Sequence, residues 1–279
     1  MSNHFKHHKY HVKHHINDHF KNHIKFLYTL MMTNFRLSLA LKGTFYFTII
    51  ITILKQVLFL TAWRFFFLKY QVVQGWNFNS MLLGYGSVCF SMGVVEAFFY
   101  GLKDLPRMIE NGQLDTFLLQ PKNVVLNVAM SKGDMASFGE IVTGIAVITY
   151  SGYLEQSPLM VITILILGTI FIFSLLLYLS CIAFFMKDSF DFIRELNLNA
   201  IIVASQPNVA YRGLLKMLTF TILPVAFISF FPIEYLRTGL WKYLLFSALG
   251  TAAFFAVANA LFNLGLKRYE SGNIIAFRH

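Results

Sequence analysis

Six long apolar stretches dominate this sequence of 279 residues. A helix needs about 20 mostly apolar residues to cross the hydrocarbon core of a bilayer. The third stretch is the weakest, because Gly139, Glu140 and Gly144 dilute it. The sequence therefore predicts an all-α, polytopic membrane protein with six transmembrane helices. They are expected near residues 43–63, 79–102, 134–152, 159–185, 213–231 and 241–266.

Composition agrees with this class. Hydrophobic residues make up 57% of the chain and charged residues 13%, whereas soluble domains carry roughly 25% charged residues. The net charge of +10 could indicate a nucleic-acid partner, but the sequence has no nucleic-acid-binding motif. In so apolar a chain, Lys and Arg more often set membrane topology. The two cysteines, Cys89 and Cys181, lie in apolar runs, which is typical of small buried side chains rather than of a disulfide.

The placement of Lys and Arg predicts the orientation of the chain. With six spans both termini lie on one side, and that side would carry 18 of the 23 basic residues. The loop after the fourth stretch contributes Lys187, Arg194, Arg212 and Lys216 to this count. The opposite side would carry Arg64, Lys69, Arg237 and Lys242. Because basic residues accumulate on the cytoplasmic side, both termini are expected in the cytoplasm.

The inner loop 103–133 contains helix and turn signals. Asp104 can cap a helix whose first turn takes Pro106, and Gly112 is a suitable stop. A second short helix, ending before Pro121, would carry Leu114, Phe117 and Leu118 on one face. Two small amphipathic helices under the membrane either rest at the lipid interface or form a docking element for a soluble partner.

Three segments carry a resemblance to a known family. The segment IENGQLDTFLLQPKN, residues 109–123, resembles a motif of ABC-2-type transporter permeases, in a branch with six spans. Its matching positions are Ile109, Gly112, Leu114, Asp115, Leu118, Leu119 and Pro121. The segment LPVAFISFFP, residues 223–232, is similar to the fifth span of that branch and the return after it. The segment GLKRYESGN resembles its closing signature, through Gly265, Arg268, Tyr269, Glu270, Ser271, Gly272 and Asn273.

The resemblance covers residues 43–273 and implies a transport subunit rather than an enzyme. Such a permease is half of a channel driven by a separate cytoplasmic ABC ATPase, and the family leans toward export. The loop 103–133, with Phe117 beside the matched residues, would hold the coupling helix that seats in a groove on the ATPase. ATP and Mg²⁺ would bind to that partner, and this chain would bind no cofactor. The sequence agrees in lacking a G-x-x-x-x-G-K-[ST] phosphate-binding loop.

The resemblance also implies a second permease, either another copy or a related chain, in the plasma (inner) membrane of a bacterium. The lipid bilayer is the other expected partner. No nucleic-acid partner is expected.

Three charged residues lie well inside predicted spans, away from the first few positions, namely Lys55, Glu96 and Glu140. A central Lys costs about 2.5–3.5 kcal/mol, so Lys55 is expected to face the bundle interior or an aqueous path. Lys55 could form an ion pair with Glu96, snorkel to the interface or contact substrate.

The segment between the last two stretches, residues 231–243, is too apolar for a free linker. Its physical chemistry indicates an amphipathic element at the outer interface. By the resemblance, it matches re-entrant outer helices that form part of the outer gate. The residues assigned to that gate are Pro224, Phe231, Pro232 and Glu234.

The N-terminal segment, residues 1–42, holds eight of the nine histidines. Its pattern predicts an amphipathic arm on the inner leaflet, with His4, His8, His11 and His15 on one face. Pairs of His at this spacing can also bind a metal ion or sense pH. The alternative function is therefore a metal-ion transporter or sensor that uses this arm. Residues 274–279 would form a short cytoplasmic tail.

Overall fold

The computed structural model describes residues 42–73, 75–120, 123–206, 211, 213–221 and 224–269, and the single positions 29, 32, 33 and 36. Throughout these residues the fold is helical without a β-strand, as the sequence predicts. Four helices in them are long and apolar enough to cross a membrane. These are α2 (Lys42–Lys69), α3 (Phe78–Phe99), α9 (Pro158–Ser180) with its extension η2 (Cys181–Phe184), and α14 (Trp241–Leu266).

Some predicted features lie outside the described residues. They are the arm before residue 42 apart from the four single positions, Pro121 of the inner loop, and the end of the chain. The candidate residues concerned are His4, His8, His11, His15, Pro121, Glu270, Ser271, Gly272 and Asn273, together with the tail 274–279.

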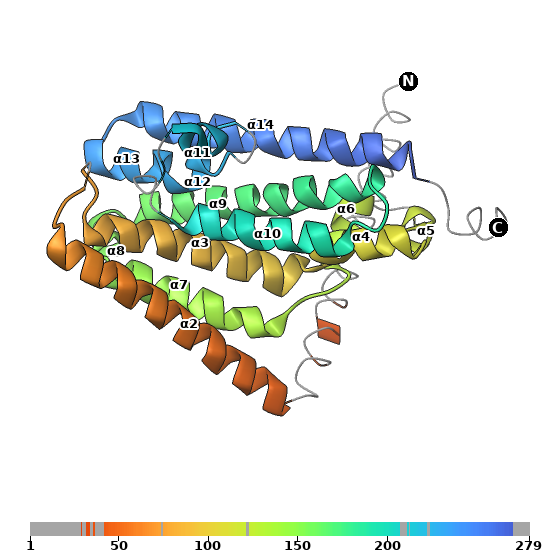
Figure 1. Cartoon of the computed structure of the whole chain (residues 1–279), viewed down its shortest axis with the longest axis horizontal. Coiled ribbons are helices and arrows are strands. Elements are labelled where there is room, and N and C mark those ends of the chain that lie inside the picture. Colours follow the sequence, from red (N-terminus) through yellow and green to blue (C-terminus); the bar gives the residue numbers. More distant parts are fainter. Residues whose placement is uncertain are drawn as a thin grey trace, which may run out of the picture.

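Helix α3 is the centre of the bundle. Its first turn is capped by Asn77, whose side chain accepts a hydrogen bond from the backbone N–H of Ser80 at 2.8 Å. It packs against α7 and α9 along most of its length, and 78% of its apolar span is buried. By contrast, only 6% of the span in α2 is buried, so α2 lies at the edge of the bundle, opposite α14 (Figure 1).

The third predicted span is confirmed as a helix. It consists of η1 (Met135–Ser137) and α7 (Phe138–Tyr150). A Cβ atom at Gly144 would lie 2.7 Å from the backbone nitrogen of Phe90, so α3 and α7 approach closely because this position has no side chain. The short helix α8 (Tyr153–Gln156) then leads into α9, which takes Pro158 in its first turn.

The predicted fifth span, residues 213–231, is wrong as a single helix. The structure divides this range into α11 (Gly213–Leu218), α12 (Ala226–Ser229) and the start of α13 (Phe231–Thr238). Pro224, which has no N–H to donate, stands directly before the turn that opens α12.

Helix α10 (Phe190–Ser205) takes the place predicted for that span. It runs antiparallel to α9 through the bundle and packs against α3, α4, α9 and α12 (Figure 1). Because α10 leads to the far end of the bundle, Lys216 on α11 lies opposite Lys187, which corrects the predicted grouping of these two residues. Arg212, placed with them by the sequence, lies outside the described residues.

The main core lies where α3, α9 and α14 meet. Aromatic rings interlock there, for example Phe171 stacked on Phe254 with centroids 5.2 Å apart. Both cysteines are buried and free, as predicted. The core continues into the inner loop, because Leu102, Leu105 and Leu114 are fully buried in the same cluster.

Candidate functional site

The inner loop forms a compact group of three short helices at one end of the bundle (Figure 1). They are α4 (Gly101–Glu110), α5 (Asp115–Leu118) and α6 (Val124–Met130). Gly112 ends the first of them with a φ of +68°, a left-handed conformation that favours glycine, so the predicted stop is confirmed. A short second helix before position 121 is confirmed as well, whereas α6 was not predicted.

The predicted start of the first loop helix is wrong. Helix α4 begins at Gly101, directly after α3, so Asp104 lies in its first turn and Pro106 in its interior. The Asp104 carboxylate is buried and forms ion pairs with Lys132 and with Arg107, the latter at 3.8 Å. Asp104 therefore holds α4 to the end of the loop instead of capping the helix.

The apolar residues of the loop divide into a buried and an exposed set. Leu114 is fully buried, and Ile109 and Phe117 pack against the core. Leu118 is 40% exposed and Leu119 is 86% exposed. The predicted shared face of Leu114, Phe117 and Leu118 is thus only partly correct, because Leu118 points away from the core and adjoins Leu119 on the surface.

Glu110, at the end of α4, binds the start of α10. Its carboxylate oxygen Oε1 accepts hydrogen bonds from the backbone N–H groups of Ser189 at 2.7 Å and Phe190 at 3.0 Å. These are free N–H groups at a helix N-terminus, where a negative charge is also favoured by the helix dipole. One turn earlier, the guanidinium of Arg107 stacks over the Phe190 ring at 4.2 Å. The loop is therefore attached to α10 as well as to α3.

Two of the motifs that carry the family resemblance meet in space. Tyr269, after the end of α14, lies beside Asp115, the first residue of α5. Burial and the neighbouring Asp115 raise the pKa of Tyr269 to about 12. Gly265 and Arg268, from the same motif, both pack on aromatic rings. A Cβ atom at Gly265 would lie 2.2 Å from the Phe184 ring, and the guanidinium of Arg268 is 5.3 Å from the centre of the Phe185 ring.

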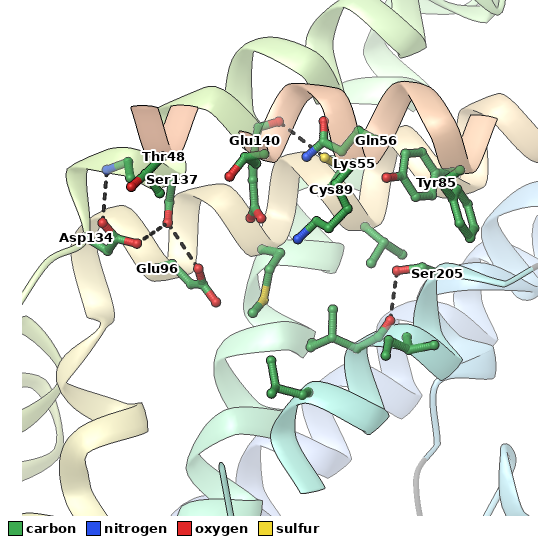
Figure 2. A pocket seen from close by; sticks show the side chains of 18 of the residues that line it. Thr48, Lys55, Gln56, Tyr85, Cys89, Glu96, Asp134, Ser137, Glu140 and Ser205 are labelled. Carbon is green, nitrogen blue, oxygen red and sulfur yellow. Dashed lines mark hydrogen bonds between the residues drawn. The ribbon is translucent and has the colours of Figure 1, made fainter. Parts of the chain in front are cut away.

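A cavity of about 610 Å³ lies between α2, α3, α7 and α10. Lys55, an exposed residue of α2, is part of its lining. Figure 2 shows the Lys55 amine and the Glu140 carboxylate directed into the same space. Phe59 and Tyr85 stack at a centroid distance of 4.7 Å and belong to the lining as well. The cavity thus brings two charged groups from predicted spans together with aromatic and apolar side chains.

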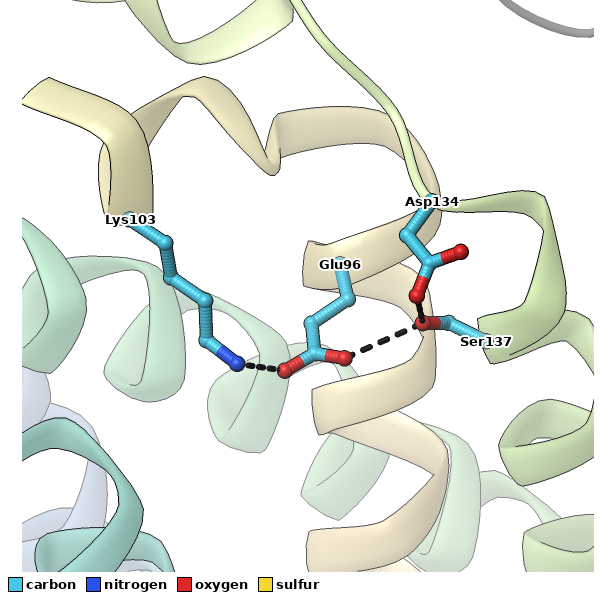
Figure 3. A network of polar contacts seen from close by, with 4 residues as sticks. All are labelled: Glu96, Lys103, Asp134 and Ser137. Atoms are coloured by element: carbon cyan, nitrogen blue, oxygen red, sulfur yellow. Dashed lines mark hydrogen bonds and ion pairs between the residues drawn. The ribbon is translucent and has the colours of Figure 1, made fainter. Parts of the chain in front are cut away.

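The ion pair between Lys55 and Glu96, one of the three alternatives considered for Lys55, does not form. Glu96 lies at the loop end of α3, where its carboxylate pairs with Lys103 (Figure 3). Its second oxygen accepts a hydrogen bond from the hydroxyl of Ser137 at 3.0 Å, and that hydroxyl is also within 3.2 Å of Asp134. Glu96 therefore connects the end of α3 to the starts of α4 and α7. Lys103, only seven residues further along the chain, takes the place considered for Lys55 as its cation.

The predicted outer element lies at the opposite end of the bundle from the inner loop. Helices α12 and α13 pack against α3 and α14, with Pro224, Pro232 and Glu234 buried. Phe231 packs against the rings of Phe227, Phe230 and other neighbours. The buried carboxylate of Glu234 pairs with Arg237 at 3.0 Å. The segment 231–243 is not one element, since α13 ends at Thr238 and α14 begins at Trp241.

Comparison with known proteins identifies one family. A model described as ABC-2 family transporter protein matches residues 49–272, which is most of the chain. Neither the curated proteins nor the solved structures contain a match to this sequence. The matched range includes the inner loop, the cavity and the outer element.

Proposed function

We propose that this chain, which belongs to the ABC-2 family of transporter proteins, is the membrane-spanning subunit of a transporter driven by a separate ATPase. The observation that carries this proposal is the surface formed by Leu118 and Leu119 on the inner loop. Leu119 is 86% exposed at the tip of a loop that is otherwise anchored in the core. A rigidly held apolar tip suits contact with a groove on a soluble partner.

The attachment of the loop supports a role in transmitting movement. A force on α5 would reach α3 through α4, because α4 follows α3 directly in the chain. The same force would reach α10 through the hydrogen bonds that Glu110 accepts. Closure of the ATPase on ATP would in this way tilt two helices that line the cavity. The cargo would be exported, the direction toward which this family leans.

The charge distribution supports a cytoplasmic position for the inner loop. The loop end of the bundle carries Lys103, Arg107, Lys132, Lys187, Arg194, Lys267 and Arg268. Helix α2, which follows the basic segment in the sequence, begins at the same end (Figure 1). The opposite end carries Arg64, Lys69, Lys216, Arg237 and Lys242. With α10 as the fifth of six crossings, both termini would lie in the cytoplasm.

A second permease, either another copy or a related chain, would complete the pathway. The lateral face of α2 supports this, because it exposes large apolar side chains to lipid or to a partner helix. They include Phe47, Ile50, Leu54, Leu58 and Phe65.

The test is the capture of the ATPase by the full chain in its native membrane. A photo-crosslinking residue at Leu119 should trap a protein that mass spectrometry identifies as an ATPase with a Walker A motif. The variant Leu119→Asp should then co-purify at least about tenfold less of it. The reason is that burial of one leucine contributes about 1.5–3 kcal/mol, and 1.4 kcal/mol corresponds to a factor of ten.

The matched control is Leu159→Asp. Leu159 is similarly exposed, at 79%, but lies at the start of α9 at the other end of the bundle. This variant should retain the ATPase. Equal recovery of the ATPase with Leu119→Asp and with the unmodified chain would disprove the proposed docking surface.

A further inference from the structure

Of the charged groups that line the cavity, some have direct ion-pair or hydrogen-bond partners and others do not. Glu96 and Lys103 pair with each other, and Asp134 accepts a hydrogen bond from the backbone N–H of Ala136 at 3.0 Å and lies 3.2 Å from the Ser137 hydroxyl. These three groups therefore have partners within the protein. The remaining two charged groups of the lining are Lys55 on α2 and Glu140 on α7.

Lys55 and Glu140 attract each other electrostatically, but in the described part of the chain they form no ion pair with each other. The amine of Lys55 forms neither an ion pair nor a hydrogen bond there, and the carboxylate oxygen Oε2 of Glu140 is buried without a hydrogen-bond donor. Both groups point into the cavity (Figure 2). The buried oxygen of Glu140 is costly without a donor, whereas Lys55 is exposed and its amine is open to a ligand. A ligand that supplies a direct partner to each group would therefore be favoured.

The rest of the lining defines the other half of the ligand. Five apolar side chains from the middle of α3 and α10 line the cavity, beside polar groups such as Tyr85 and Ser205. The apolar five are Val88, Met92, Leu198, Ile201 and Ile202. A volume of about 610 Å³ is sufficient for a drug-sized molecule. Charged groups and an apolar surface in one cavity are complementary to an amphipathic molecule.

The two charges together restrict the class of the head group. A simple cation would be attracted by Glu140 but repelled by Lys55. A simple anion would be attracted by Lys55 but repelled by Glu140. An uncharged apolar ligand would leave both groups without partners. A head group with one ammonium and one phosphate or carboxylate can satisfy both.

We propose that this cavity binds an amphipathic zwitterion. The anionic group of the ligand pairs with Lys55, its ammonium group donates to Glu140, and its apolar chain lies against α3 and α10. The proposal that the cavity binds such a ligand depends only on the geometry of the cavity. The proposal that this ligand is the transported cargo rests on the proposed function.

Binding to the purified full chain in a neutral maltoside detergent tests this proposal without an ATPase. Three probes with the same eight-carbon chain are compared, namely octyl phosphoethanolamine, octylammonium and octyl phosphate. The zwitterionic probe should bind at least about tenfold more tightly than the purely cationic or the purely anionic probe. Phosphoethanolamine without the chain should bind at least about tenfold more weakly than its octyl ester.

Two variants should change the relative affinity for octylammonium and octyl phosphate in opposite directions. Lys55→Met leaves Glu140 as the unpaired charge, so the ratio of affinities should move at least about tenfold toward octylammonium. Glu140→Gln should move it by a similar factor toward octyl phosphate. Because each measurement is a ratio for two probes on the same sample, a partly unfolded variant gives the same ratio as a fully folded one.

Exposed charges away from the cavity provide the controls. Lys187→Met and Glu155→Gln should leave the preference unchanged. Equal binding of the three probes, or unchanged ratios in both cavity variants, would overturn the proposal. Tight binding of phosphoethanolamine alone would contradict the amphipathic part. If the three probes bind equally while the crosslinker at Leu119 still captures an ATPase, only the proposed ligand class is disproved and the proposed function stands.

Discussion

The phenolic hydroxyl of Tyr269 lies next to the carboxylate of Asp115, although 154 positions separate the two residues in the sequence. The hydroxyl has no hydrogen bond of standard geometry in the described residues, but the carboxylate is close enough to raise its pKa. The ring of Tyr269 also meets Phe184 edge-on at 6.3 Å. The end of α14 is thereby packed against the inner loop.

This contact predicts a loss of stability at alkaline pH. Burial and Asp115 raise the pKa of Tyr269 to about 12, whereas tyrosines of an unfolded chain titrate near 10. The folded chain therefore holds this proton more tightly. Its contribution is complete below about pH 10 and is lost as the pH rises to about 12. Tyr269→Phe should reduce the fall in the thermal unfolding midpoint between pH 9 and pH 11.

The control for this experiment is Tyr150→Phe. Tyr150 is 77% exposed at the end of α7, so its removal should leave the alkaline fall unchanged. Identical pH curves for the Tyr269 variant and the unmodified chain would show that the contact does not affect this proton.

The cap of α10 predicts a local change in hydrogen exchange. Glu110→Ala removes the acceptor of the Ser189 and Phe190 N–H groups, which should cost about 0.5–2 kcal/mol. Amide exchange in residues 186–195, measured by mass spectrometry, should become faster. Glu110→Gln keeps an oxygen acceptor but loses the charge, so its exchange should be intermediate.

Glu155→Ala is the matched control, since Glu155 is an exposed carboxylate on α8. It should leave exchange in residues 186–195 unaffected. If Glu110→Ala also leaves it unaffected, α10 does not depend on this cap.

The glycines of α7 predict opposite outcomes for the same substitution. Gly144→Ala would place a Cβ atom 2.7 Å from the backbone nitrogen of Phe90, which cannot move alone, and should destabilise the bundle by about 1–3 kcal/mol. At Gly139 the nearest atom is a side-chain carbon of Ile49 at 3.4 Å. Gly139→Ala should be neutral or stabilising by up to about 1 kcal/mol. Unfolding midpoints of the two variants in detergent are the measurement, and equal midpoints would refute the close approach.

The ion pair of the outer element predicts a non-additive effect. Arg237→Met leaves the buried carboxylate of Glu234 without its cation and should cost about 1.5–3 kcal/mol. Adding Glu234→Gln to this variant should restore part of the loss, because the unpaired charge disappears. A double-mutant cycle of unfolding midpoints measures the coupling.

Arg194→Met is the control for that cycle. Arg194 pairs with Asp191 and Glu195, which are 81% and 60% exposed, so its loss should cost at most about 1 kcal/mol. Additive effects of the Glu234 and Arg237 substitutions would exclude an energetic role of the pair.

The periodicity and length of apolar runs were sufficient to predict the long helices. Helix α14 has the predicted bounds, and α9 with η2 differs by one residue at each end. Helix α10 could not be found in this way, since Asp191, Arg194 and Glu195 lower its hydropathy near one end. Apart from Ile193, its buried residues, namely Asn197, Ala200 and Ala204, are small or polar. Residues 213–231 gave the opposite error, because an apolar run says nothing about the breaks that a proline and tight turns introduce.

Features of the candidate site were predictable where all the residues that form them are neighbours in the sequence. The turn at Gly112 and the short helix after it follow from local sequence. The partners of Glu96 and Glu110 do not, because they depend on which helix ends meet. A carboxylate at the end of an amphipathic helix, such as Glu110, is a signal for a cap, but the capped helix can only be seen in the fold.

Helix α10 begins at the cap supplied by Glu110 and ends at Ser205, which lines the cavity. Sixteen residues at 1.5 Å each make a rod of about 24 Å. In the transporter proposed above, such a rod would act as a lever between the inner loop and the cavity. A displacement of its Glu110 end would move Leu198, Ile201 and Ser205, which line the cavity, and would alter the width of the cavity.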